Sequence, residues 1–158
     1  MTLAYLGLGS NLGDRAAHLE FALEALRPVR VSPFYETAPL GYLEQAAFLN
    51  CVCEVETALS PWALLGEIHR LENLRQRERP FPNAPRTLDI DILLYSNFIV
   101  RSPRLTIPHP RLTERAFVLA PLADLLPAYR PLLEGLSGQE IRRIDATGAE
   151  PSAPPRPR

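Results

Sequence analysis

Hydrophobic and polar side chains alternate strictly along residues 87–92. The apolar set is Leu88, Ile90 and Ile92, and the polar set is Thr87, Asp89 and Asp91. Successive side chains of a strand point to opposite faces, so this alternation predicts a strand with one face in the core. The next residues, up to Tyr95, are all apolar, which predicts that both faces of the strand are covered at that end.

Similar patterns predict the other elements in the first part of the chain. Strands are expected over residues 3–8, 29–37 and 48–57, and Pro33 favours an edge position or a bulge in the second of them. Helices are expected over residues 14–26 and from Ser60–Pro61 to the arginine-rich segment 75–85.

The pattern is less regular after Tyr95. Ser96–Asn97 is typical of a two-residue turn, so we expect residues 98–100 to pair back on the preceding strand as a hairpin. Residues 114–126 are expected to form short helical pieces broken by Pro121, and residues 138–144 a turn or two of helix.

The order of these elements indicates the fold class. Strand, helix, two strands, helix and hairpin are typical of an α+β fold. We expect a ferredoxin-like sandwich, with helices packed on a mainly antiparallel sheet. A chain of 158 residues suffices for one domain. We expect that domain over residues 1–147, followed by a proline-rich, disordered tail over residues 148–158.

The two aspartates of the alternating strand are the first candidate for chemistry. Residues two apart on one strand face have carboxylates roughly 7 Å apart, a separation that two metal ions or one shared ion can bridge. Two solvated polar positions, or an Asp capping a turn, are the alternatives. The segment 75–85 just before this strand contains three arginines and three prolines. Since Mg²⁺ on carboxylates and arginine forks both hold phosphate oxygens, a polyphosphate site is favoured.

Composition and charge narrow the choice further. The net charge of −1 provides no general field for nucleic acid or an anionic membrane, so an anion site must be a local cluster. All 17 cationic side chains are arginine and none is lysine, which excludes a lysine-anchored P-loop and a Schiff base. Cys51 and Cys53 fall on one strand face, where they cannot form a relaxed disulfide with each other. We expect free thiols and a cytoplasmic location, because neither a signal peptide nor a transmembrane helix is recognisable.

Other polar residues permit two interpretations each. Asn50 interrupts an apolar strand, and its amide either bonds to nearby backbone or faces a ligand. His109 lies between two prolines near Arg111 and Arg115, so it is either structural or a donor to phosphate. Arg75 is interpreted as part of a solvated face. The glycines at positions 7, 9 and 13 lack the spacing of a dinucleotide fingerprint, and a tight turn is their expected use.

Several of these motifs, taken in order, resemble one enzyme family. They are Tyr5–Gly13, Thr37–Gly41, Phe48–Asn50, Pro85–Asp91, Pro108–Arg111 and Arg115–Val118. The family is 6-hydroxymethyl-7,8-dihydropterin pyrophosphokinase, and the resemblance covers about residues 3–128. It implies that the chain transfers the pyrophosphoryl group of ATP to the pterin alcohol, releasing AMP, in folate biosynthesis. ATP and the pterin are then the partners, with no nucleic acid, membrane or obligate protein partner implied.

The resemblance also implies roles for individual residues. Asp89 and Asp91 correspond to ligands of two Mg²⁺ ions between ATP and the attacking hydroxyl. The positions at which the family makes phosphate or loop-closing contacts are occupied here by Arg77, Arg79, Arg86, His109 and Arg115. Of these, Arg77 and Arg86 are implied to be catalytic, together with the two aspartates. The ATP site is implied to include His69, Glu72, Ile92 and Thr106. The pterin is implied to contact Thr37, Leu40, Phe48, Asn50 and Phe117; where many members have tyrosine, Phe48 offers no hydroxyl.

Two other classes of function remain open at this level. A different Mg²⁺-dependent phosphotransferase would share the aspartate pair and the arginines, but would not need the pocket of Thr37, Leu40 and Asn50. A non-catalytic nucleotide-binding domain would keep the same core and tolerate loss of both aspartates.

Overall fold

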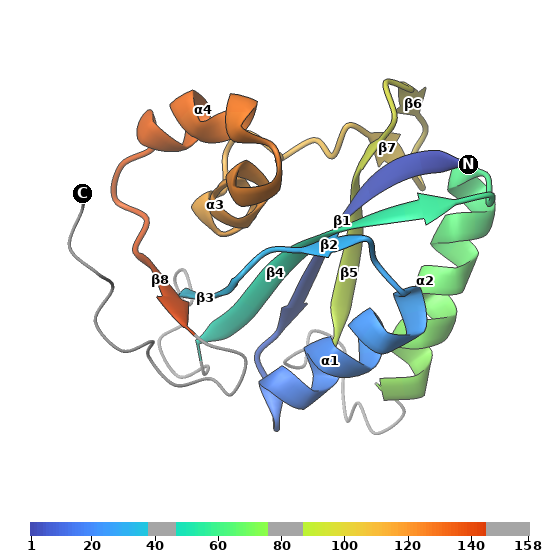
Figure 1. The fold of residues 1–158 in the computed structure, drawn as a ribbon, viewed down its shortest axis with the longest axis horizontal. Coiled ribbons are helices and arrows are strands. Elements are labelled where there is room, and N and C mark those ends of the chain that lie inside the picture. The colour runs from blue at the N-terminus through green and yellow to red at the C-terminus, as the bar shows by residue number, and fades with distance from the viewer. Residues whose placement is uncertain (38–46, 76–86, 145–158) are drawn as a thin grey trace.

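The computed structural model describes residues 1–37, 47–75 and 87–144. Its strands are β1 (Thr2–Ser10), β2 (Arg30–Val31), β3 (Phe34–Thr37), β4 (Phe48–Thr57), β5 (Asp89–Tyr95), β6 (Val100–Arg101), β7 (Thr106–Ile107) and β8 (Ile141–Ile144). Its helices are α1 (Arg15–Leu26), α2 (Pro61–Arg75), α3 (Ala116–Leu125), the 3₁₀ turn η1 (Pro127–Tyr129) and α4 (Arg130–Glu134). Figure 1 shows their arrangement.

One antiparallel sheet organises these elements. Its strand order is β5-β1-β4-β3-β8, and β2 pairs with the far end of β4. The unit from β1 to β5 therefore has the strand order and the two crossover helices of a ferredoxin-like α+β fold, which confirms the predicted fold class.

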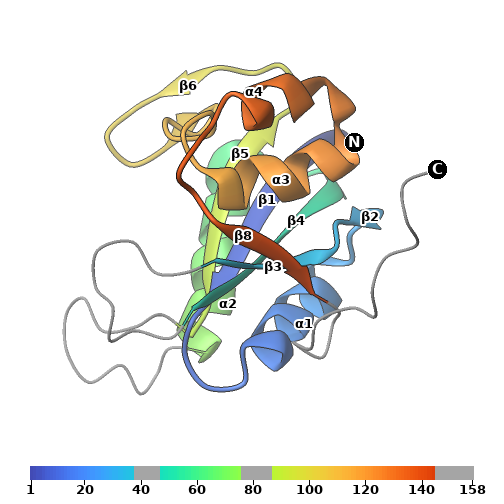
Figure 2. The same ribbon diagram turned by 90° about the vertical axis from the view of Figure 1, so that its left-hand side faces the viewer.

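Helices cover both faces of the sheet. On one face α1 and α2 enclose the larger core, in which Leu19 and Ile68 pack against Leu6 and Leu8 of β1. On the other face α3 packs with Val118 and Leu122 against a smaller core. Figures 1 and 2 show α3 and α4 across the sheet from α1 and α2. Because α3 covers only part of its face, the rest of that face is available for a site.

The alternation along β5 is observed as predicted, up to one irregularity. Leu88, Ile90 and Ile92 are buried in the larger core, on the face opposite Asp89 and Asp91. The register with β1 then shifts, because Leu6 pairs with Ile92 and Tyr5 with Leu94, which leaves Leu93 as an extra residue. After this bulge Tyr95 faces the larger core, while Leu93 and Leu94 pack with the smaller one.

Most of the expected elements are confirmed. The strand over 48–57 and the helices over 14–26 and from Ser60–Pro61 have the predicted bounds within a residue or two. Asp14 caps α1 by accepting a hydrogen bond from the Ala17 N–H. Pro33 interrupts the predicted strand 29–37, so that β2 and β3 pair with β4 as two segments. The two cysteines are buried free thiols in the larger core.

The predicted hairpin over 98–100 is wrong. The turn at Ser96 forms, but its N–H donates to the Leu3 carbonyl, and Val100 pairs with Ile107 in a separate two-stranded sheet of β6 and β7. The outer side of β5 is met instead by the His109 N–H, which donates to the Leu93 carbonyl.

Two helix predictions near the C-terminus are also wrong. Pro121 lies inside a continuous α3, because eight of the ten residues of this helix are buried and their packing outweighs the cost of about 3 kcal/mol of an interior proline. Residues 141–144 form a strand rather than a helix. Their apolar residues, Ile141 and Ile144, have helical spacing, but pairing with β3 decides the conformation. The predicted tail over 148–158 lies outside the described residues.

Charged groups join β8 and α1 to strand β3. Glu36 of β3 binds Arg15 of α1 at 2.8 Å and also Arg142 of β8. Arg15 donates a further hydrogen bond to the Ala47 carbonyl. Burial raises the pKa of Glu36, but the two guanidinium groups outweigh it and hold the pKa below its usual value. Among the described residues no helix is both long and apolar enough to cross a membrane.

We expect Glu36→Gln to lower the free energy of unfolding at pH 7 by about 1–2 kcal/mol, because both charge-assisted hydrogen bonds are weakened. The ordinary glutamate pKa is 4.5 and the folded one is lower, so this contribution is present above pH 4.5 and is lost as the pH falls through the folded pKa. Urea unfolding of both proteins at pH 7 and at acid pH measures it. Glu24→Gln, at an exposed position of α1, is the control, and an equal effect of both variants would contradict this assignment.

Candidate active site

A cavity of about 330 Å³ lies on the sheet face that α3 leaves partly open. Its floor is formed by neighbouring positions of three adjacent strands, β5, β1 and β4: Gly7, Gly9, Asn50, Val52, Asp89, Asp91 and Leu93. Its wall is formed by Arg111 and Arg115 and by Phe117 and Val118 of α3, with Thr37 and Phe48 at one end. The volume is at the lower end of the range of small-molecule sites.

The register of β1 sets the floor of the cavity. Gly9 pairs with Asp89 on one side and with Asn50 on the other, and Gly7 pairs with Asp91. Neither glycine has a side chain to fill the space above the sheet. A Cβ on Gly9 would lie 2.7 Å from the Asn50 Oδ1 atom, and one on Gly7 would lie 3.4 Å from Leu93. The prediction that these two glycines form a tight turn is wrong, because they lie within β1. Of the three glycines in that prediction, Gly13 alone has a positive φ, of 68°.

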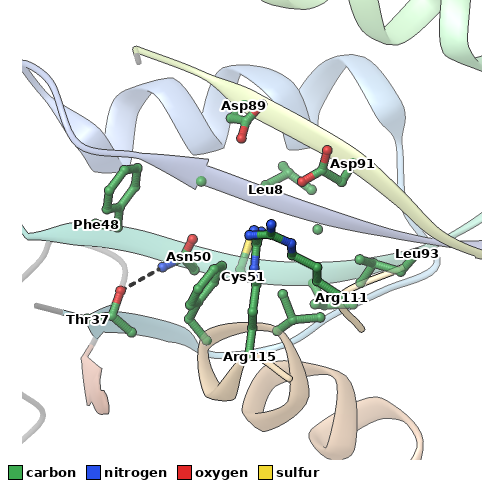
Figure 3. A pocket seen from close by; sticks show the side chains of 15 residues that line it. Leu8, Thr37, Phe48, Asn50, Cys51, Asp89, Asp91, Leu93, Arg111 and Arg115 are labelled. Carbon is green, nitrogen blue, oxygen red and sulfur yellow. Dashed lines mark hydrogen bonds between the residues drawn. The ribbon is translucent and has the colours of Figure 1, made fainter. Parts of the chain in front are cut away.

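The amide of Asn50 is buried and held at one end of the cavity. Its Nδ2 atom donates to the Thr37 hydroxyl at 3.3 Å, a bond drawn in Figure 3. Its Oδ1 atom leans over Gly9. The amide therefore bonds to a neighbouring side chain rather than to backbone, and it also lines the cavity. That it faces a ligand stays a prediction.

Opposite charges face each other across the cavity. Figure 3 shows Asp89 and Asp91 on β5 and the guanidinium groups of Arg111 and Arg115 directed into the space from the α3 side. The Arg115 guanidinium also lies 5.4 Å from the ring centre of Phe117. Within the described ranges no group of three or more His, Cys, Asp or Glu side chains gathers as a metal site. A site with carboxylates on one side and arginines on the other suits a ligand that carries both phosphates and a metal ion.

His109 lies beside this charged region. Its Nδ1 atom accepts a hydrogen bond from the Arg111 N–H at 3.2 Å. Burial lowers the pKa of His109, and the charges of Arg115 and Arg111 lower it further against the opposing effect of Asp89. The imidazole therefore favours the neutral form near pH 7.

The outer edge of β5 is also held by the neighbouring helix. The Glu72 carboxylate of α2 accepts a hydrogen bond from the Ile90 N–H at 2.9 Å. At the start of the strand, the Thr87 hydroxyl donates to the Arg75 carbonyl at 2.7 Å. Both contacts fix the position of the strand that carries the aspartates. Arg75 is not the solvated residue that we predicted, since its guanidinium stacks over the Phe21 ring at 4.4 Å.

The structure brings together about half of the predicted site residues. The ones that line the cavity are Thr37, Phe48, Asn50, Asp89, Asp91, Arg115 and Phe117. The others with described positions are His69, exposed on α2; Glu72, bonded to Ile90; Ile92, buried in the larger core; Thr106, bonded to the Ser102 carbonyl; and His109, beside the cavity. Leu40, Arg77, Arg79 and Arg86 lie outside the described residues. The roles assigned to all of these residues stay predictions.

Sequence reasoning missed the glycine floor, and it left Arg111 out of the predicted set. Glycines at positions 7 and 9 of an apolar strand fall on one face, and this spacing could have indicated an open patch on the sheet. Leu93 and Val118 also line the cavity, but an apolar residue in a buried strand or helix carries no signal that separates a pocket from a core.

Comparison with known proteins identifies the family. The family described as 7,8-dihydro-6-hydroxymethylpterin-pyrophosphokinase (HPPK) matches residues 5–127. The chain belongs to this family. As a pyrophosphokinase it is an enzyme of the transferase class, and the resemblance drawn from the motifs is confirmed.

Relatives align over most of the chain, and two of the three described here have this activity in their names. The 2-amino-4-hydroxy-6-hydroxymethyldihydropteridine pyrophosphokinase of Bacillus subtilis is 44% identical over 129 residues, which are 78% of this chain and 77% of that protein. The Haemophilus influenzae protein of the same name is also 44% identical, over 79% of this chain and 82% of its own length. The folic acid synthesis protein fol1 of Schizosaccharomyces pombe is 42% identical, but the matched part is 20% of that protein.

Solved structures support the same fold. The crystal structure of wild-type Plasmodium falciparum HPPK-DHPS matches with a TM-score of 0.69 at 18% identity, over 84% of this chain and 44% of that chain. The HPPK chain described here thus spans less than half of that protein, and at this identity the likeness concerns the fold alone.

We expect Gly9→Ala to weaken ligand binding in the cavity, because the new Cβ would displace the Asn50 amide. The loss should be about tenfold or more in affinity for 6-hydroxymethyl-7,8-dihydropterin, measured by calorimetry. Gly66→Ala is the matched control: it lies in α2 with nothing within 4 Å of the added atom, so it should stabilise the protein by up to about 1 kcal/mol and leave affinity unchanged. Unaltered affinity of a folded Gly9→Ala variant would contradict a role of the Asn50 side chain in binding the pterin.

We expect His109 to make the protein less stable in mild acid. Its folded pKa is below the ordinary value of 6.5, so the unfolded chain takes up the proton more readily as the pH falls below about 6.5. His109→Gln should therefore flatten the decline in stability between about pH 7 and pH 5, measured by urea unfolding. His69→Gln, at an exposed position of α2, controls for the substitution itself. The same decline in His109→Gln as in the wild type would exclude this effect.

Proposed function

We propose that this cavity transfers the pyrophosphoryl group of ATP to 6-hydroxymethyl-7,8-dihydropterin, giving AMP and the pterin diphosphate of folate biosynthesis. Family membership supplies the reaction class. The observation that carries the assignment to this cavity is the arrangement of its floor and wall, with Asp89 and Asp91 facing two arginines at one side and a buried amide at one end.

The aspartate pair supports binding of Mg²⁺ together with the ATP phosphates. Mg²⁺ usually takes one or two protein carboxylates and completes its coordination with water and substrate phosphates, and Asp89 and Asp91 offer that donor set on one strand face. When bound, Mg²⁺ neutralises phosphate charge and orients the reacting groups. We propose two Mg²⁺ ions, because Asp89 and Asp91 both face the cavity and each carboxylate can bind one ion.

The arginines support a role in holding the phosphates. The guanidinium group is planar and charged at every physiological pH, and it binds phosphate oxygens through paired N–H groups. Arg111 and Arg115 reach the cavity from the side opposite the carboxylates, so a polyphosphate between them would meet positive charge on one side and metal on the other. His109, in its neutral form, offers the phosphates one more hydrogen-bond donor at the margin of the cavity.

The other end of the cavity supports recognition of the pterin. Asn50 and Thr37 offer hydrogen-bond donors and acceptors to the polar edge of a planar ring. The glycine floor lets such a ring approach the sheet closely. Phe48 and Phe117 line the same space and offer ring faces for stacking. Leu40 belongs to this proposal through the family resemblance.

The chain's own residues then act mainly by position and charge. They hold the hydroxymethyl oxygen of the pterin in line with the β-phosphorus of ATP, from which AMP departs. Such alignment and electrostatic preorganisation supply most of the rate in phosphoryl transfer. We also propose a cytoplasmic location, which the free thiols of Cys51 and Cys53 and the use of ATP favour.

We expect wild-type protein to release AMP from Mg-ATP only when the pterin is present, and we expect Asp89→Asn and Asp91→Asn to lower kcat by at least about 100-fold. Each change removes one carboxylate charge at nearly constant shape. AMP and ADP are separated by chromatography, and the Mg²⁺ dependence is recorded with each protein.

Asp14→Asn is the matched control, since asparagine caps a helix about as well as aspartate and Asp14 caps α1 rather than lining the cavity. It should retain full activity. Formation of ADP instead of AMP, or AMP without pterin dependence, would rule out the proposed reaction. Full activity of both strand variants would rule out the metal assignment.

A further inference from the structure

Arg115 is the residue just before α3, and its side chain does not cap that helix. Its backbone is extended, with φ −119° and ψ 115°, and its carbonyl accepts bonds from the Val118 and Leu119 N–H groups. The first N–H groups of a helix have no partner within it, and the residue at this position usually supplies one from its side chain. Here the side chain points into the cavity instead (Figure 3), so the cap must come from elsewhere.

Gln139 supplies that cap and makes a second bond beside it. Its side-chain oxygen accepts a hydrogen bond from the Ala116 N–H at 2.8 Å. Its side-chain nitrogen donates to the Glu114 carbonyl at 2.9 Å. These two groups belong to the two peptide units that flank Arg115. Because those units set the direction of the Cα–Cβ bond, one planar amide fixes the direction in which the Arg115 side chain leaves the backbone.

Gln139 is itself held independently of the cavity. It follows Gly138, whose φ of 75° suits a glycine, and it precedes β8, which pairs along β3. The ion pair between Arg142 and Glu36 anchors that strand further, and Figure 2 shows β8 beside β3. Gln139 also lies beyond residue 127, where the match to the HPPK family ends.

We propose that Gln139 is a positioning residue for pyrophosphoryl transfer, because its amide holds the peptide groups around Arg115 and so keeps the guanidinium directed at the phosphates of ATP. The inference rests on the proposed function for the identity of that ligand. An arginine with a fixed backbone loses less freedom when it binds phosphate, so the benefit lies in preorganisation.

The test is a double-mutant cycle with Gln139→Met, Arg115→Met and the double variant. Methionine keeps the length of glutamine and removes both hydrogen bonds. With saturating pterin, Gln139→Met should lower kcat/KM for ATP about tenfold, chiefly through KM, and should change it by less than about twofold when Arg115 is already methionine. Glu140→Met, at the exposed neighbouring position, is the control and should match the wild type.

Gln139→Glu is a second variant, and it should keep wild-type activity if Gln139 served only to stabilise the fold. A carboxylate can still accept from Ala116 at the helix N-terminus, so thermal stability should be retained. It cannot donate to the Glu114 carbonyl, so kcat/KM should stay low. Wild-type kcat/KM in either Gln139 variant would overturn the proposal, and so would an equal loss in both Arg115 backgrounds together with a lower melting temperature.

A binding measurement separates this proposal from the reaction itself. Inorganic tripolyphosphate, titrated by calorimetry, should bind about tenfold more weakly to Gln139→Met than to wild type, and equally to Arg115→Met and the double variant. If the four proteins follow this pattern of affinities but the wild type releases no AMP, the result would count against the proposed function while supporting the role of Gln139. Identical tripolyphosphate affinities in wild type and Gln139→Met would overturn that role.

Discussion

The antiparallel register of β1 between β4 and β5 is the constraint on which the site depends. It sets Gly9 between Asp89 and Asn50 in one row across the sheet and Gly7 beside Asp91 in the next. A slip of one residue would turn the glycines toward α1 and α2 and bring Leu6 or Leu8 under the cavity. Burial of Leu6 and Leu8 in the larger core therefore holds the register, and the same force keeps the floor of the cavity open.

The two faces of the sheet are built for different purposes. The face under α1 and α2 is filled by apolar side chains from β1, β3, β4, β5 and β8. Among the described residues, the face under α3 carries a smaller apolar cluster that includes Tyr5, Val52 and Leu93, and next to it the polar groups that line the cavity. Stability thus comes mainly from one layer, while the other layer can carry carboxylates and an amide at positions where apolar packing is absent.

Local patterns predicted the parts of this arrangement that depend on periodicity. The alternation around Asp89 and Asp91 gave the strand and the faces of its side chains, and seven of the site residues implied by the family resemblance line the cavity. The prediction failed where distant contacts decide the conformation. Ile141 and Ile144 have helical spacing but pair with β3, and Pro121 stays helical because α3 is buried. Gln139 carries no local signal, since its partners lie at the start of α3.

The bulge at Leu93 has a consequence for how the molecule can change. It separates β5 into two halves whose side chains follow the alternation out of phase with each other. The half that carries Asp89 and Asp91 is bound by the register with Gly7 and Gly9, whereas the half with Tyr95 is bound by its own place in the larger core and by a hydrogen bond to the Leu59 carbonyl. An insertion or deletion beyond the bulge can therefore be absorbed there without rotating the carboxylates off the cavity. A change in the length of the connection between β5 and β6 therefore leaves the positions of Asp89 and Asp91 at the start of the strand unchanged.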